Sequence, residues 1–242
     1  MIQIVKPAKV NLPDLAVKGA AEVNKMTAQY NAGIRQFKFA SSIYGDAAVK
    51  KKLIKIQHDK CCFCERKISA GEPGHIEHYR PKAGYKADEN TPIVRPGYFW
   101  LAYEFSNLYY SCYRCNCTYK KNYFPLSDET QRAYYHVRDI SREDPLILDP
   151  CSDPSRHLIF QRENIKPKGG SAYGKETIKK TGLNRKALAT ERREYLNTLD
   201  ILAKIARGNG SDALDAQNHF RTISQKKSLF SYMVICNFPD LV

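Results

Sequence analysis

Two Cys-x-x-Cys pairs constrain the fold of this 242-residue chain more than any other feature of its sequence. The first pair is Cys61 and Cys64, and the second pair is Cys112 and Cys115. Because two intervening residues allow a tight turn to aim both thiolates at one metal ion, two such pairs can complete the tetrahedral shell of Zn²⁺. A zinc ion held by four sulfurs has no open position for water, so we expect it to stabilise the fold and not to carry out a reaction.

The remaining cysteines do not form a third pair. Cys62 and Cys117 lie beside the pairs, whereas Cys151 and Cys236 stand apart. A ligand set that uses Cys62 with Cys64 stays open, although it loses the usual spacing, and otherwise we interpret Cys62 and Cys117 as small buried hydrophobic residues. Grouped cysteines in a reducing compartment indicate a metal more than disulfides, and a redox protein with two dithiols is the weaker alternative.

The chain shows neither a secretory signal nor a membrane span. Residues 1–10 lack the continuous apolar run of a signal peptide. No stretch approaches the roughly 18 apolar residues that a membrane span requires. We therefore expect a cytoplasmic protein without a membrane partner.

The charge of the chain indicates a polyanionic partner. Lysine and arginine number 39 against 25 aspartate and glutamate residues, which gives a net charge of +14. Such an excess attracts the phosphates of DNA or RNA. Charge alone leaves open the alternative that the lysines serve only solubility.

Chemically active residues lie between and just after the cysteine pairs, beginning with the run Gly-His-Ile-Glu-His-Tyr-Arg-Pro-Lys at 74–82. Hydrolysis of a phosphodiester needs a base that takes a proton from water and a cation that holds the departing oxygen. His78 is the best candidate for the base, because an imidazole keeps a substantial neutral fraction at cytoplasmic pH. Glu77 and Asn116 offer hard oxygens to one Mg²⁺ or Mn²⁺ ion.

Other histidines and tyrosines fit these roles less well. His75 is the main rival for the base, but it does not directly follow the carboxylate. The tyrosines near the second pair could stack on unpaired bases or pack in the core, and we favour the core. These tyrosines are Tyr109, Tyr110 and Tyr113, and the histidines for which we expect structural roles are His58, His136, His157 and His219.

The order and spacing of these residues from Cys61 to Lys120 resemble the ββα-metal motif of HNH endonucleases. The shared pattern is a carboxylate beside a histidine, a later Asn-Leu pair, and Cys-x-x-Cys-Asn. The His-Tyr-Arg-Pro-Lys run, Trp100, and Phe-Pro-Leu at 124–126 are also similar to the PtuB family, the HNH subunit of Septu-type and retron-associated anti-phage systems. Leu-Asp-Pro at 148–150 and Gly-Leu-Asn-Arg at 182–185 extend this resemblance over most of the chain.

The resemblance implies a metal-dependent endonuclease that cleaves DNA or structured RNA such as tRNA, as the effector subunit of an anti-phage defence complex. In HNH enzymes the middle asparagine orients the catalytic histidine, and Asn107 matches it by position. Glu77 stands where Asp is more frequent and Asn116 where the class name has His, but both keep an oxygen donor.

The resemblance also implies partners. These are an SMC-like or ABC-like ATPase of the PtuA type and, in retron systems, a reverse transcriptase with its RNA and DNA. The Gly-x-x-x-x-Gly-Lys-Ser/Thr pattern of nucleotide-binding loops is absent from this sequence. We therefore expect any ATP dependence to reside in the partner.

Three basic residues near the motif are candidates for contact with substrate phosphates. Arg80 and Lys82 follow His78 and could clamp neighbouring phosphates. Lys120 lies four residues after Asn116, so the two share one face if the second cysteine pair opens a helix. For each of the three, a solvated charge is the alternative.

We expect an α+β fold with a zinc-braced ββα-metal core at residues 56–130. Residues 1–55 are expected to form a helical docking segment, and residues 131–242 a mostly helical region with a partner interface. Periodicity predicts one helix over Val49 to Ile56 and another from Arg185 to about Ala206, with Asn184 as its cap. Residues 158–160 predict a strand and residues 81–97 a loop-rich insert. The apolar stripe of the longer helix, which we expect to pack in the core, is Leu188, Tyr195, Leu196, Leu199, Leu202 and Ile205.

One further function is consistent with these patterns. A zinc-stabilised nucleic-acid-binding or adaptor module would keep the same cysteines and basic residues without catalysis. It would bind nucleic acid tightly and in a salt-sensitive way but would not cleave it in Mg²⁺ or Mn²⁺.

Overall fold

The computed structural model describes residues 1–135 and 139–242, so His136 lies outside the described residues. Helices and two small sheets alternate along the chain, which confirms a mixed fold of helices and short strands. The elements, with η for short helices, are α1 (Pro13–Asn31), α2 (Ser41–Tyr44), α3 (Ala47–Ile56), β1 (His75–His78), η1 (Phe99–Leu101), η2 (Phe105–Asn107), β2 (Leu108–Ser111), η3 (Arg114–Lys120), η4 (Glu129–Gln131), η5 (Ile140–Arg142), η6 (Pro154–Arg156), β3 (Leu158–Gln161), β4 (Asn164–Pro167), η7 (Lys168–Gly170), α4 (Ala172–Thr181), α5 (Lys186–Ala206), α6 (Ala213–Ile223) and α7 (Ser231–Asn237).

The central sheet consists of β1 and β2, which pair antiparallel although a long insert separates them in sequence. Glu77 lies opposite Tyr109, and His78 lies opposite Leu108. All four residues of β2 are buried, because α3 packs against this strand. The side-chain amide of Gln57 adds a further pair of hydrogen bonds to β2: its Nε2 donates to the Tyr110 carbonyl at 2.7 Å, and its Oε1 accepts from the Tyr110 N–H at 2.8 Å.

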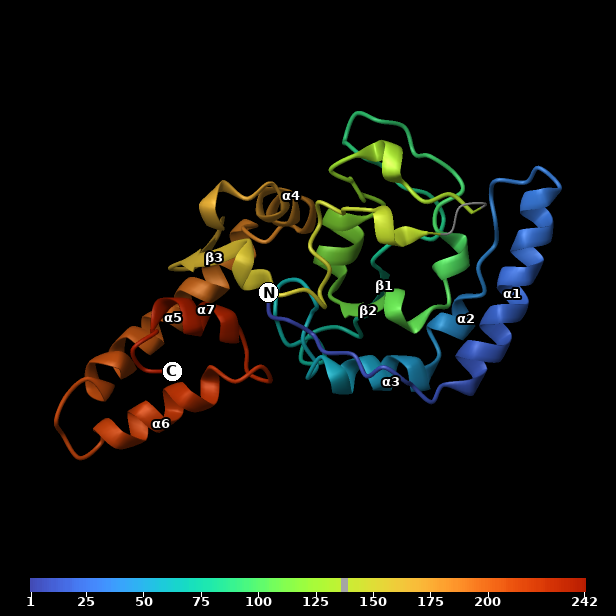
Figure 1. Ribbon diagram of the computed structural model, residues 1–242. Helices are drawn as coiled ribbons and strands as arrows, with labels where there is room; N and C mark the ends of the chain where they lie inside the picture. Colours follow the sequence, from blue (N-terminus) through green and yellow to red (C-terminus); the bar gives the residue numbers. More distant parts are fainter. Residues whose placement is uncertain (136–138) are drawn as a thin grey trace.

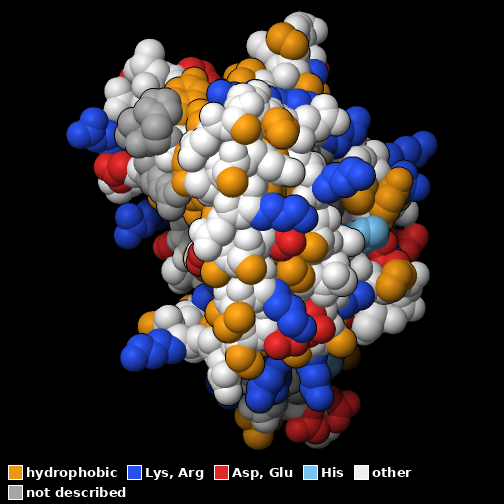
Figure 2. Space-filling model, turned by 90° about the vertical axis from the view of Figure 1, so that its right-hand side faces the viewer, with side chains coloured by type: hydrophobic (Ala, Val, Ile, Leu, Met, Phe, Trp, Pro, Cys, Tyr) orange, Lys and Arg blue, Asp and Glu red, His pale blue; other side chains and the backbone are white. Residues whose placement is uncertain are grey.

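Helical regions lie on two sides of the central sheet (Figure 1). The N-terminal helix α1 packs against η1 and α2 on one side. On the other side, α4 contacts η3, and α5, α6 and α7 form the far end of the molecule together with β3. Figure 2 shows the face on the α1 side, where blue basic side chains are dispersed among orange apolar ones, so the positive charge is not gathered into one patch there.

The two helices predicted from periodicity are present. In α3, Val49 and Leu53 are buried, and the Asp46 carboxylate caps the helix by accepting from the Ala48 N–H at 2.8 Å. In α5, the predicted stripe packs in the core over most of its length, since Leu188, Leu196 and Leu199 are buried. The stripe fails at its end, where Ile205 is 44% exposed.

The expected cap of α5 is wrong. Arg185 is the N-cap residue, and no side chain caps this helix. Asn184 instead pairs with the backbone of β4: its Oδ1 accepts from the Ile165 N–H at 2.9 Å, and its Nδ2 donates to the Ile165 carbonyl at 2.8 Å. An amide carries both a donor and an acceptor, so it can take the place of a neighbouring strand.

The other local predictions also have clear outcomes. Residues 158–160 lie in β3, as predicted, and residues 81–97 contain no helix or strand. Leu158 and Phe160 point into the core, whereas Gln161 is exposed, so the strand follows the expected alternation.

No helix among the described residues is long and apolar enough to cross a membrane.

Gly182 joins the C-terminal region to the centre of the molecule. It ends α4 in the left-handed conformation, with φ of 62°. A Cβ at this position would lie 2.5 Å from atoms of the Tyr119 ring in η3. Gly169 has a similar φ of 57°, but a Cβ there would meet nothing within 4 Å.

We predict that Gly182→Ala lowers the free energy of unfolding more than Gly169→Ala does. Gly169→Ala should cost only the backbone strain, on the order of 1–2 kcal/mol. Gly182→Ala should cost that strain plus roughly 1–3 kcal/mol of overpacking against the Tyr119 ring. Chemical denaturation of the two variants measures the difference, and equal losses would contradict the close packing of α4 on η3.

Candidate functional site

The four cysteines of the two pairs meet at one point. The Sγ atoms of Cys61, Cys64, Cys112 and Cys115 all lie within 4.8 Å of one another, and all four residues are buried. This arrangement suits a tetrahedral metal ion and excludes the alternative set with Cys62, whose thiol is not part of the group. The described residues therefore contain a four-cysteine group arranged to hold a metal ion, which is consistent with the structural zinc that the sequence predicts.

The prediction for the two neighbouring cysteines is half right. Cys62 is buried, and its N–H donates to the Tyr110 carbonyl at 3.0 Å. Cys117 is exposed, because it lies on the solvent side of η3. It is therefore not the buried hydrophobic residue that its place beside the second pair suggested.

Arg185 contacts the sulfur cluster and was not singled out as a site residue by the sequence. Its guanidinium nitrogens lie 3.4 Å from the Cys115 Sγ, 3.8 Å from the Cys64 Sγ and 3.9 Å from the Cys112 Sγ. Burial opposes its charge, but the neighbouring thiolates raise the pKa of Arg185 above its ordinary value. A divalent ion with four thiolates carries excess negative charge, which this guanidinium offsets.

We predict that Arg185→Ala weakens metal retention without unfolding the protein. Loss of the guanidinium removes the charge-assisted contacts to three sulfurs, and loss of such outer partners typically costs 10–100-fold in metal affinity. Arg185→Lys should restore part of the effect, because it keeps the charge but not the fork of donors. Zinc release to a chromogenic chelator measures retention, and identical release rates in all three proteins would contradict this role.

His78 is buried, and its ring is fixed from three sides. Its Nε2 lies 2.9 Å from the Ala102 carbonyl oxygen, which can only accept, so Nε2 carries the proton. Its Nδ1 is then the basic atom, with the Lys82 Nζ 3.4 Å away. The ring of Tyr44 contacts the imidazole edge-on, with 4.7 Å between ring centroids.

Electrostatics keep the His78 imidazole neutral. Burial and the positive charge of Lys82 lower the pKa of His78 well below its ordinary value, although the hydrogen bond to Ala102 acts in the opposite direction. A neutral imidazole whose Nδ1 carries no proton can accept one, so this side chain is in the state that a general base requires.

Glu77 lies beside His78 and is paired with a lysine. The Lys120 Nζ is 2.5 Å from the Glu77 Oε1, in an ion pair without hydrogen-bond geometry, and it donates to the His78 carbonyl at 3.2 Å. Burial raises the pKa of Glu77, and the charge of Lys120 partly offsets this effect. Lys120 is 0% exposed, so the structure does not place it where it could reach a substrate phosphate, contrary to expectation.

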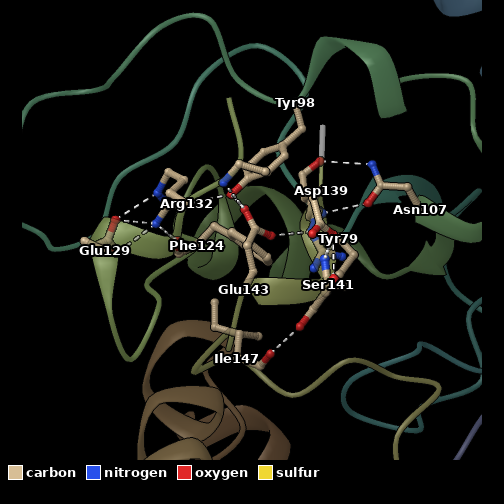
Figure 3. A network of polar contacts seen from close by, with 12 residues as sticks. Tyr79, Tyr98, Asn107, Phe124, Glu129, Arg132, Asp139, Ser141, Glu143 and Ile147 are labelled. Atoms are coloured by element: carbon tan, nitrogen blue, oxygen red, sulfur yellow. Dashed lines mark hydrogen bonds and ion pairs between the residues drawn. The ribbon is translucent and has the colours of Figure 1, made fainter. Parts of the chain in front are cut away.

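Asn107 does not touch the imidazole that it was expected to orient. Its Oδ1 accepts from the Arg80 N–H at 2.8 Å, and its Nδ2 donates to the Arg80 carbonyl at 3.0 Å (Figure 3). The same Nδ2 donates to the Leu101 carbonyl at 3.1 Å. Asn107 therefore fixes the backbone that follows His78, and the Ala102 carbonyl orients the ring directly.

Arg80 forms an ion pair within the protein through its Nε. Its Nε donates to the Glu143 Oε2 at 2.8 Å. The other Glu143 oxygen accepts from the Tyr98 hydroxyl at 2.6 Å and from the Ala133 N–H at 3.0 Å. This network holds the segment after His78 against the chain around Glu143, as Figure 3 shows. The expected phosphate clamp at Arg80 is thus an internal ion pair.

A cavity of about 110 Å³ brings most of the remaining predicted residues together. It is lined by Glu77, His78, Lys82 and Asn116 among others. The amide side chain of Asn116 has no hydrogen-bond partner among the described residues, so its oxygen is available to a ligand. Two further polar residues, which the motifs in the sequence did not indicate, also line the cavity: Lys121 and Asn122.

The competing histidine and the tyrosines lie elsewhere. His75 does not line the cavity and contacts the ring of Tyr113, with 5.5 Å between centroids. Tyr109 and Tyr110 are buried in the core, as expected, whereas Tyr113 is 49% exposed. His157 bonds the Ser171 hydroxyl at 2.8 Å, which fits a structural role.

We predict that Asn107→Asp destabilises the protein although it preserves side-chain shape. The carboxylate keeps an acceptor for the Arg80 N–H but faces the carbonyls of Arg80 and Leu101 without a donor. The buried unmade bonds should cost about 1–3 kcal/mol, and more for a charged group. Thermal and chemical unfolding test this expectation, and an unchanged stability would mean that these bonds do not form in solution.

Comparison with known proteins gives three relatives, and no family model matches. The chain is 37% identical over 198 residues to the Septu protein PtuB of Bacillus mycoides, an alignment that covers 81% of this chain and 66% of that protein, about two thirds of its length. It is 27% identical over 169 residues to a candidate HNH endonuclease of retron Vc95 from Vibrio cholerae, covering 66% of this chain and 69% of the relative. It also matches the Septu protein PtuA of Bacillus mycoides at 24% identity over 155 residues, which is 64% of this chain but 21% of PtuA.

The similarity to PtuB extends over most of this chain. It is consistent with the resemblance to PtuB that the sequence motifs indicated, among them the four cysteines, Glu77 and His78. The match to the retron protein covers a smaller share of the chain at lower identity. The chain belongs to the PtuB family of Septu proteins.

Proposed function

We propose that this chain is a metal-dependent HNH endonuclease that hydrolyses phosphodiester bonds of DNA or of structured RNA such as tRNA. The observation that carries the proposal is the convergence of a neutral His78, Glu77 and Asn116 on one cavity. The relatives support the proposal, since one of them is named as a candidate HNH endonuclease of a retron. We retain the division into residues 1–55, 56–130 and 131–242 as part of this proposal.

The central elements supply the parts of a ββα-metal finger. In this proposal β1 presents Glu77 and His78, β2 pairs with it, and η3 follows the second cysteine pair and presents Asn116. The helix of the finger is wider than an α-helix, because η3 is a π-helix. Such wide turns are frequent at functional sites.

His78 performs the proton transfer in the proposed reaction. Its Nδ1 accepts a proton from the attacking water, while its Nε2–H stays bonded to the Ala102 carbonyl and fixes the tautomer. Because burial and Lys82 disfavour the protonated ring, the Nδ1 lone pair is available before substrate binds. The Lys82 ammonium beside Nδ1 could also attract a phosphate, which is the role expected from its place after His78.

Glu77 and Asn116 would hold the catalytic Mg²⁺ or Mn²⁺. Their carboxylate and amide oxygens fit a hard divalent ion, and both residues line the same cavity. When bound, such an ion supplies positive charge to the departing 3′-oxygen. Lys120 already contacts one Glu77 oxygen, so the second oxygen is the one left for the ion. With a single charged ligand, the protein alone should bind the ion weakly, and substrate phosphate would complete the shell.

Relatives named for Septu and retron systems support a role in anti-phage defence. We propose that the chain acts as the effector subunit beside a PtuA-like ATPase, with a reverse transcriptase and its RNA and DNA where a retron is present. The zinc site would then brace the finger and take no part in the reaction.

A second candidate is a zinc-stabilised adaptor that binds nucleic acid without cleaving it. The Lys120–Glu77 ion pair favours this alternative, because it occupies one of the oxygens proposed as metal ligands.

We predict that His78→Ala lowers cleavage by about 10²–10⁴-fold, which is the usual contribution of a general base. His75→Ala, on the same strand but outside the cavity, serves as the matched control and should keep most of the activity. The assay is nicking of plasmid DNA and cleavage of tRNA in Mg²⁺ or Mn²⁺, with the co-expressed partner and with zinc content measured in each protein. Full cleavage by zinc-loaded His78→Ala would assign the base to another residue. Binding without cleavage in the wild type would favour the adaptor.

A further inference from the structure

A second hollow, different from the catalytic cavity, lies beside η3. Its volume is about 520 Å³. Arg114 and Tyr119 of η3 line it, together with Lys186 at the start of α5. Asn116 of the same short helix lines the catalytic cavity instead. The helix η3 therefore contributes residues to both hollows.

We propose that this second hollow binds the phosphodiester backbone of nucleic acid a few nucleotides from the scissile bond. This proposal rests on the proposed nuclease function in one respect, namely that the bound nucleic acid is also the substrate. The charges that line the hollow support the binding site independently of that function.

The basic residues of the hollow differ in how far they are already paired. Arg66 forms an ion pair with Glu191, the single acidic residue in the lining, at 2.9 Å. Arg185 is held against the cysteine sulfurs. Arg114 and Lys186 have no hydrogen bond or ion pair among the described residues. Two unpaired cations thus face one hollow whose only carboxylate is occupied, so the hollow has positive charge to offer an anion.

The shape of the hollow suits a phosphate backbone. An arginine and a lysine from two different elements can contact two neighbouring phosphates, and the half-buried ring of Tyr119 gives an apolar wall for a sugar or a base. The first turn of α5 also opens here without a side-chain cap or an acidic residue, so its positive end adds to the attraction.

The width of η3 limits how closely one bound strand could join the two hollows. A helix with its side chains is about 10–12 Å wide. A duplex strand advances about 3.4 Å per nucleotide. Because η3 is a π-helix and wider than an α-helix, a strand that crosses it from the catalytic cavity would need at least about three nucleotides to reach the second hollow.

The experiment compares two double variants that each remove two positive charges. Arg114→Ala/Lys186→Ala removes the unpaired cations of the hollow. Lys51→Ala/Lys204→Ala removes two exposed lysines elsewhere, on α3 and at the far end of α5. Both are made in the full-length chain with His78→Ala, so that bound probe is not cleaved. Zinc content and thermal unfolding confirm that each protein is folded.

Binding is measured by fluorescence anisotropy with labelled duplex DNA, single-stranded DNA and an RNA hairpin, at a series of KCl concentrations in Ca²⁺. We expect the Arg114/Lys186 variant to bind its best probe at least about tenfold more weakly at low salt. The slope of log affinity against log salt should become shallower by about two, because each phosphate that the protein neutralises on duplex DNA adds about 0.9 to that slope. The Lys51/Lys204 variant should keep the slope of the parent.

Equal slopes in the two double variants would overturn the proposal, as would a parent that binds none of the probes. Cleavage assays with His78 intact keep the two proposals separate. If the wild type cleaves and the slopes are equal, the hollow is wrong and the nuclease stands. If the wild type never cleaves and only the Arg114/Lys186 variant has a shallower slope, the hollow stands and the nuclease is wrong.

Discussion

The cluster of four cysteine sulfurs is the interaction on which the rest of the structure depends. It joins a turn before β1 to a turn after β2, and Cys64 and Cys112 are separated by 48 positions in sequence. A two-stranded sheet as short as β1 and β2 is marginal alone. The bound metal ion that we propose would hold both strands and η3 in one frame. Arg185 extends this frame to α5, since its guanidinium contacts three of the sulfurs.

Burial explains the chemistry of the catalytic cavity. The same exclusion of water keeps the His78 ring neutral and raises the pKa of Glu77. A buried carboxylate is costly without a cation, and the Lys120 ammonium supplies one at 2.5 Å. The Lys120 ammonium therefore stabilises the buried carboxylate and at the same time occupies one of the two oxygens that we propose as metal ligands.

Side-chain amides that replace backbone partners recur throughout the fold. Gln57 pairs with both backbone groups of Tyr110, Asn184 with those of Ile165, and Asn107 with those of Arg80. Each amide fixes the edge of a short strand or the turn after one. The partners lie 53, 19 and 27 positions away in sequence. Such distant partners cannot be read from the sequence. Asn184 was therefore expected to cap a helix, and the resemblance to HNH enzymes implied that Asn107 orients the imidazole, but neither hydrogen bond is present among the described residues.

The sequence by itself determined the four sulfur ligands, α3, α5 and β3, because these follow from spacing and local periodicity. The grouping of His78 with Glu77 and Asn116 was implied by the resemblance to HNH endonucleases, and the three residues line one cavity. Only the tertiary structure decided which charges are free. Arg80 and Lys120 have the residue types of phosphate ligands, yet Glu143 and Glu77 bind them inside the protein. No motif in the sequence indicated Arg114 or Lys186. Both line a hollow, and neither has an ion pair among the described residues. A charge is available to a ligand only if no opposite charge lies beside it, and that depends on contacts between distant parts of the chain.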